Sequence, residues 1–128
     1  MKLNTQLTIA SLLSIFFLSF HIADDIVRGF EKGGLSTFNA VLIMVVWLYG
    51  TLMLTGRRSG YIITLLFSLL GVGVPILHLK GKGVGGDFAK SSGAIFFIWT
   101  LLAIGATSLF SVILSVQGLW RLRRGKTQ

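Results

Sequence analysis

Four polar residues at helical spacing form the stretch of the sequence best suited to chemistry. Between His21 and Arg28, a long uncharged run meets its first two acids and then a base. His21, Asp24, Asp25 and Arg28 stand at i, i+3, i+4 and i+7. If these residues belong to one helix, all four lie on one face of it. We therefore take this face as the first candidate for a binding site.

A second histidine widens the chemistry that this face can support. His21 and His78 are the only histidines in the chain. Imidazole and carboxylate groups suit zinc, copper or iron, and side chains one turn apart on a helix can share a metal. One interpretation is therefore a divalent metal held by His21, His78 and Asp25, or a haem b ligated by the two histidines.

A structural role for the same residues is the interpretation that the sequence favours. In it, Asp24 or Asp25 pairs with Arg28, and His21 donates a hydrogen bond to a carboxylate. The cluster then pins the following loop at the membrane interface. A solute pathway or a protein-docking site built from the same residues is a third interpretation.

Composition places these residues in a membrane protein. The 128 residues are 53% hydrophobic and 12% charged, with a mean hydropathy of +0.82, whereas soluble domains are about 25% charged. Four uncharged runs, at 3–23, 35–56, 59–79 and 91–120, each reach the ~20 residues that a helix needs to cross ~30 Å of hydrocarbon. No run shows the short alternating segments of a transmembrane strand.

The fold expected from these runs is all-α. We predict an integral membrane up-and-down bundle of four transmembrane helices, over about residues 4–28, 36–55, 60–79 and 91–120. The whole chain, 1–128, then forms a single domain. Small residues at spacings of three and four predict that one face of the fourth helix packs inward, because small side chains let helices approach closely in lipid. They are Gly105, Ser108, Ser111 and Ser115.

The third predicted helix contains the only proline of the chain, Pro75. Proline has no N–H, so it cannot donate to the carbonyl of Gly71. We predict a break or kink over Gly71, Gly73 and Pro75 that faces protein or water, because a free carbonyl is costly in lipid. The break is either a packing device or a hinge that positions His78.

The distribution of bases predicts the orientation of the chain. With the N-terminus inside, seven bases lie inside and five outside, in agreement with the positive-inside rule. The inner bases are Lys2, Arg57, Arg58, Arg121, Arg123, Arg124 and Lys126, and the outer ones are Arg28, Lys32, Lys80, Lys82 and Lys90. Both termini are then cytoplasmic, and all four acids lie outside together with both histidines.

The sequence lacks the residues and motifs that several classes of protein require. It has no cysteine, which excludes disulfides and thiolate metal sites, and it has no serine-hydrolase elbow, zinc-protease or Walker motif. Gly81, Gly83 and Gly86 match G-x-G-x-x-G, but they follow an apolar helix instead of a strand, so we interpret them as a loop. The excess of bases beside apolar runs indicates anionic lipid headgroups as partners and argues against nucleic acid.

From these observations we expect a small, non-enzymatic integral membrane protein. It would bind or pass a small solute or ion, or act as an accessory membrane subunit. The expected protein partners are further copies of the chain in a homo-oligomer, or the other members of a larger membrane complex. The alternative is a metal- or haem-binding membrane protein that uses His21 and His78. An absorbance spectrum and elemental analysis of the purified protein distinguish the two, since only the alternative requires a bound metal or haem.

Overall fold

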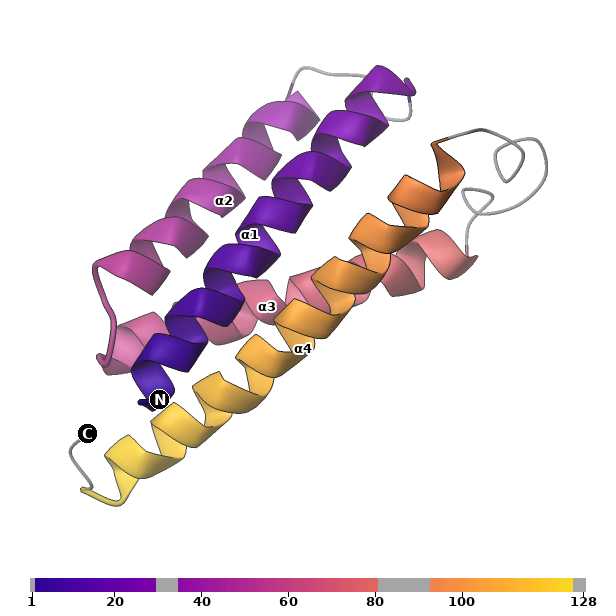
Figure 1. The fold of residues 1–128 in the computed structure, drawn as a ribbon. Helices are drawn as coiled ribbons and strands as arrows, with labels where there is room; N and C mark the ends of the chain where they lie inside the picture. Colours follow the sequence, from indigo (N-terminus) through magenta and orange to yellow (C-terminus); the bar gives the residue numbers. More distant parts are fainter. Residues whose placement is uncertain (1, 30–34, 81–92, 126–128) are drawn as a thin grey trace.

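All the regular structure that is described is helical. The structure, a computed structural model, describes residues 2–29, 35–80 and 93–125, so the predicted glycine loop at 81–86 lies outside it. Four helices follow one another along the chain: α1 (Leu3–Val27), α2 (Leu35–Leu52), α3 (Arg58–Lys80) and α4 (Ala94–Arg123). They run up and down, with the start of α1 and the end of α4 at the same end of the bundle (Figure 1). The predicted all-α bundle of four helices is confirmed.

The helix ends differ from the predicted ones by a few residues. α2 ends at Leu52 instead of residue 55. The Thr55 hydroxyl donates to the carbonyl oxygen of Thr51 over 2.6 Å, which satisfies an acceptor that the end of the helix leaves free. Gly56 then adopts a φ of +76°, a left-handed conformation that favours glycine. This short turn places α3 antiparallel to α2.

Hydroxyl groups line the interior of the bundle, and large apolar side chains cover its outside. Leu66, Leu70 and Leu102 are 57%, 57% and 62% exposed, the reverse of what a soluble protein shows. Among the serines whose burial the structure describes, six have no exposed surface: Ser11, Ser14, Ser68, Ser108, Ser111 and Ser115. Helices α1, α3 and α4 are long and apolar enough to cross a membrane, and the apolar part of α2, Thr37–Leu52, is shorter. These helices suit a small membrane protein.

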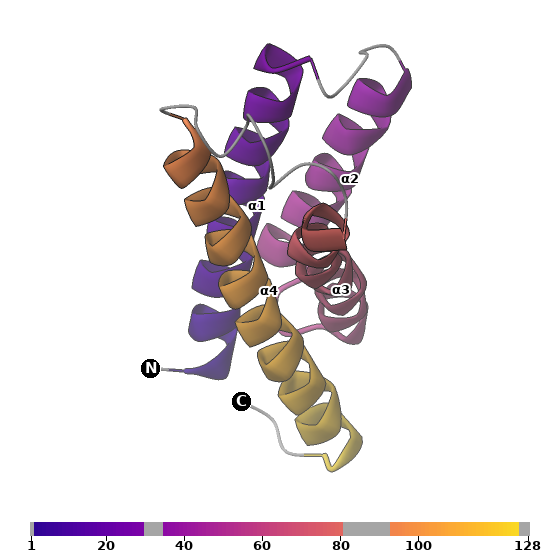
Figure 2. The same cartoon turned by 90° about the vertical axis from the view of Figure 1, so that its right-hand side faces the viewer.

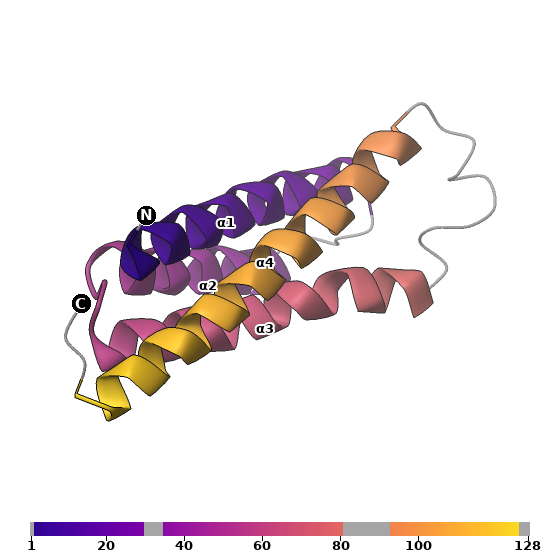
Figure 3. The ribbon, with the colours of Figure 1, turned by 60° about the horizontal axis from the view of Figure 1, so that its bottom comes forward.

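Close approach of α3 and α4 accounts for the small residues between them. A Cβ atom built on Gly71 would lie 2.2 Å from Ser108 Oγ, and one on Gly118 would lie 2.1 Å from the Tyr61 ring. α4 packs mainly against α1 and α3 and crosses both (Figures 2 and 3). The inward orientation predicted for the serine face of α4 is confirmed by the burial of its serines.

α3 runs from Arg58 to Lys80 without interruption. Gly71, Gly73 and Pro75, where the sequence predicts a break, all lie within the helix. Gly71 is buried against α4, and the ring of Pro75 lies beside Gly105. Gly71 and Pro75 therefore face α4.

Candidate metal centre

The structure brings three of the candidate residues together between α1 and α3. His21 Nε2 lies 3.4 Å from Asp25 Oδ2, and His78 Nε2 lies 3.8 Å from the same oxygen. The two imidazole rings are 4.7 Å apart, centroid to centroid. One donor atom from each residue can be chosen so that all three lie within 4.8 Å of one another. His21, Asp25 and His78 form what we call the His–Asp cluster.

Helix geometry and an aromatic side chain together position the His–Asp cluster. His21 and Asp25 stand one turn apart on α1 and point inward, with 2% and 8% of their surfaces exposed. Phe97 of α4 is fully buried, and its ring lies 5.1 Å from that of His21 and 5.6 Å from that of His78. Phe97 therefore restrains both imidazoles. Nothing in its sequence spacing distinguishes it from the other phenylalanines.

The hydrogen bond of His78 leaves one of its nitrogens available as a ligand. Nδ1 lies 2.9 Å from the carbonyl oxygen of Val74. Because a carbonyl only accepts, Nδ1 must carry the hydrogen, and in the neutral ring Nε2 keeps its lone pair. Histidines that bind metals usually donate their other N–H in this way. Nε2 then faces Asp25 Oδ2, and a cation between these two acceptors would stabilise the pair.

His21 is buried without a well-formed hydrogen bond, and its one polar contact is the 3.4 Å approach of Nε2 to Asp25 Oδ2. Neither Nδ1 nor Nε2 has a hydrogen-bond partner among the residues that the structure describes. A buried polar atom without a partner costs about 1–3 kcal/mol. A ligand that engages one of these nitrogens would remove part of that cost.

Asp24 and Arg28 form a separate ion pair beside the His–Asp cluster. Arg28 Nε donates to Asp24 Oδ2 over 2.7 Å, at the i, i+4 spacing. The guanidinium group lies 6.0 Å from the centroid of the Phe97 ring and close to Gly93 at the start of α4. Of the four residues on the predicted face, two thus contribute to the cluster and two form an ion pair whose arginine also lies beside α4.

Two of the three donor separations can be compared with those around a small metal ion. Ligands bound tetrahedrally at ~2.0–2.1 Å lie about 3.3–3.4 Å from one another. Asp25 Oδ2 lies 3.4 Å from His21 Nε2 and 3.8 Å from His78 Nε2, so His78 would move slightly toward a bound ion. A cavity of about 250 Å³ adjoins the His–Asp cluster and is also lined by Trp47 and Phe67. It leaves room for a further ligand.

Comparison with protein-family models, curated proteins and solved structures finds no match to this chain.

Haem b does not fit between the two histidines. A bis-histidine haem places the iron and its whole macrocycle between the two rings. The rings of His21 and His78 are only 4.7 Å apart and nearly perpendicular, at 77°. Phe97 packs against both of them. The donor set therefore suits a bare ion and not a porphyrin.

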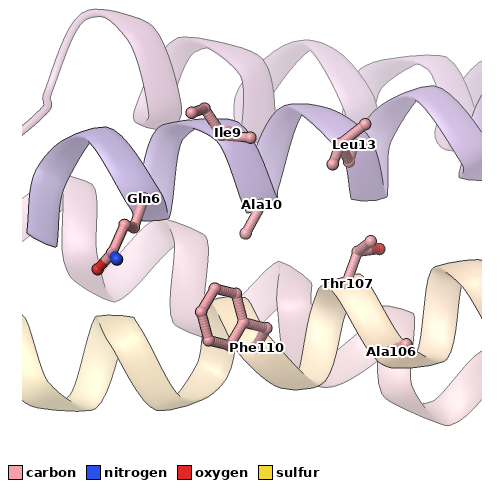
Figure 4. Close-up of a pocket in the computed structure, with 7 residues that line it drawn as sticks. All are labelled: Gln6, Ile9, Ala10, Leu13, Ala106, Thr107 and Phe110. Carbon is pink, nitrogen blue, oxygen red and sulfur yellow. The ribbon is translucent and has the colours of Figure 1, made fainter. Parts of the chain in front are cut away.

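A second hollow, between α1 and α4, has a different character. It measures about 420 Å³, and the side chains that line it come from α1 and α4 (Figure 4). Its lining carries no titratable side chain and consists of Gln6, Ile9, Ala10, Leu13, Ala106, Thr107 and Phe110. Such a surface suits contact with lipid chains, so the His–Asp cluster remains the candidate site.

Proposed function

We propose that this chain is a small multi-pass integral membrane protein that binds a divalent first-row transition metal. His21, Asp25 and His78 are its protein ligands. The observation that carries the proposal is the convergence of three donor atoms within 4.8 Å inside a bundle whose outer surface is apolar. It combines the two functions expected from the sequence, binding a small ion and binding a metal.

The donor set narrows the choice of ion. Two imidazoles and one carboxylate suit zinc or iron(II), and the set resembles the two-histidine, one-carboxylate sites that keep open positions. Magnesium and calcium prefer sites made of oxygen ligands. Titration calorimetry of the full chain, purified in detergent and freed of metal, tests this selectivity. Saturable binding of one Zn²⁺ per chain without binding of Mg²⁺ is expected, and equal weak heats from both ions would contradict it.

The cavity beside the His–Asp cluster gives space for a further ligand of the proposed ion, in addition to the three protein ligands. Most of its lining is apolar and comes from α1, α2 and α3. An ion held by three protein ligands there would complete its shell with water or with a solute that enters the cavity. This arrangement supports a role in holding or passing the ion.

The proposed orientation places the His–Asp cluster at the outer side and both termini inside. Because the chain lacks cysteine, Val27→Cys and Ser59→Cys give single labelling sites near opposite ends of the bundle. Both positions are exposed. An impermeant thiol reagent should label Val27→Cys in intact cells and Ser59→Cys only after lysis. The opposite pattern would reverse the orientation.

Pro75→Ala tests whether the proline positions His78. Alanine restores an N–H that can donate to the carbonyl of Gly71, and the resulting adjustment of α3 should displace His78, three residues farther on. We expect zinc affinity to fall about tenfold, as when the orienting partner of a metal ligand is lost, with helicity and thermal stability unchanged or higher. Calorimetry and circular dichroism measure the two effects. Unchanged affinity would assign Pro75 to packing alone.

A further inference from the structure

Arginines gather at the end of the bundle opposite the His–Asp cluster. α3 begins at Arg58, directly after Arg57, and the last turn of α4 carries Arg121 and Arg123. Within residues 2–29, 35–80 and 93–125, the acids are Asp24 and Asp25, both at the other end. The positive charge at this end therefore has no acidic neighbour in the part of the chain that is described.

Two of these arginines border a groove with an apolar wall. The groove lies between α3 and α4, measures about 530 Å³ and is lined by Arg58, Ile62, Leu119, Leu122 and Arg123. Charge and apolar surface thus meet in one hollow. A phospholipid has the same division, with a phosphate next to acyl chains.

An aromatic side chain places the groove at the level of lipid headgroups. Trp120 is 55% exposed, and the guanidinium carbon of Arg124 lies 3.8 Å from the centroid of its ring. Exposed tryptophans at the ends of membrane helices lie at the headgroup level. α4 has 30 residues and at 1.5 Å per residue spans about 45 Å, longer than the ~30 Å hydrocarbon core. Its last turns can therefore reach the phosphates.

We propose that this groove binds one anionic phospholipid. The phosphate lies between the guanidinium groups of Arg58 and Arg123, and an acyl chain follows the wall formed by Ile62, Leu119 and Leu122. Guanidinium groups hold phosphate through paired, charge-assisted hydrogen bonds. Two arginines without an acidic neighbour select a headgroup with net negative charge over a zwitterionic one. Basic pockets between membrane helices on the cytoplasmic side bind anionic lipids in this way.

The chain offers a matched control for the charge. Arg58→Gln/Arg123→Gln removes two charges from the groove, and Arg57→Gln/Arg121→Gln removes two charges from the same end without touching its lining. All four side chains are exposed, so neither variant disturbs the core. Leu122→Asn keeps the charge and makes the apolar wall polar.

Native mass spectrometry of the purified full chain, titrated with phosphatidylglycerol or with phosphatidylcholine of the same acyl chains, tests the proposal. We expect one retained phosphatidylglycerol per chain and about tenfold weaker retention in the Arg58→Gln/Arg123→Gln variant. The control variant should stay within about twofold of the unmodified chain, and Leu122→Asn should weaken retention. Equal losses in the two double variants, equal retention of both lipids, or full displacement by inorganic phosphate would each overturn the proposal.

Discussion

Asp25→Asn is expected to lower the zinc affinity of the purified protein at least about a hundredfold, because losing even an orienting partner of a metal ligand costs about 10–100-fold. The substitution replaces a charged ligand oxygen in the His–Asp cluster with a neutral amide. His21→Gln and His78→Gln should have effects of the same order, since each removes one imidazole ligand. Titration calorimetry with Zn²⁺ measures all three.

Asp24→Asn is the matched control for this prediction. It removes the same charge from the neighbouring position on α1, but Asp24 pairs with Arg28 and lies outside the His–Asp cluster. We expect its zinc affinity to stay within about threefold of the unmodified chain, the size of a screened charge effect. Equal losses for Asp24→Asn and Asp25→Asn would mean that zinc responds only to the general charge of this end. That result would support the structural interpretation of the cluster.

Gly118→Leu is expected to lower the free energy of unfolding by about 3 kcal/mol, at the upper end of the range for overpacked cores. A Cβ atom at position 118 would lie 2.1 Å from a carbon of the Tyr61 ring. Tyr61 is 1% exposed, and its hydroxyl donates to the Asn4 side chain, so the ring has little freedom to move. Denaturant unfolding in detergent micelles, followed by circular dichroism, measures the loss.

Gly73→Ala serves as the control for the packing of α3 against α4. A Cβ atom there meets nothing within 4 Å, and alanine is favoured over glycine in a helix by about 0.5–1 kcal/mol. This variant should be neutral or slightly more stable. Similar destabilisation by Gly73→Ala and Gly118→Leu would indicate that glycine flexibility, and not close helix contact, is what the bundle requires.

The fold was largely predictable because lipid imposes a simple rule on sequence. A spanning helix needs about 20 apolar residues, and four such runs gave helices close to the observed ones. The serine face of α4 was also predictable, since small residues at helical spacing mark contacts between helices in lipid. The exact end of α2 was not, because it depends on a hydrogen bond from Thr55 to its own helix.

The position of the candidate site was predictable along the helix axes but not across the bundle. Alternating helices put His21 and His78 at similar depth, yet sequence does not say whether α1 and α3 are neighbours. The observed ring separation of 4.7 Å comes from tertiary packing. The sequence also gave no reason to select Phe97 of α4, which contacts the rings of both histidines. The sequence left haem open as a ligand, and the short distance between the two rings, together with the packing of Phe97 against both, excludes it.

The most direct test of the metal centre is the coordination shell of the ion bound to the purified chain. The chain is loaded with one equivalent of Zn²⁺, washed free of unbound ion and measured by X-ray absorption at the zinc edge. We predict about one zinc per chain, with a first shell of nitrogen and oxygen at ~2.0–2.1 Å and the outer-shell scattering of two imidazoles. A shell of oxygen alone without imidazole scattering, or loss of the zinc on washing, would contradict the assignment of His21, Asp25 and His78 as its ligands.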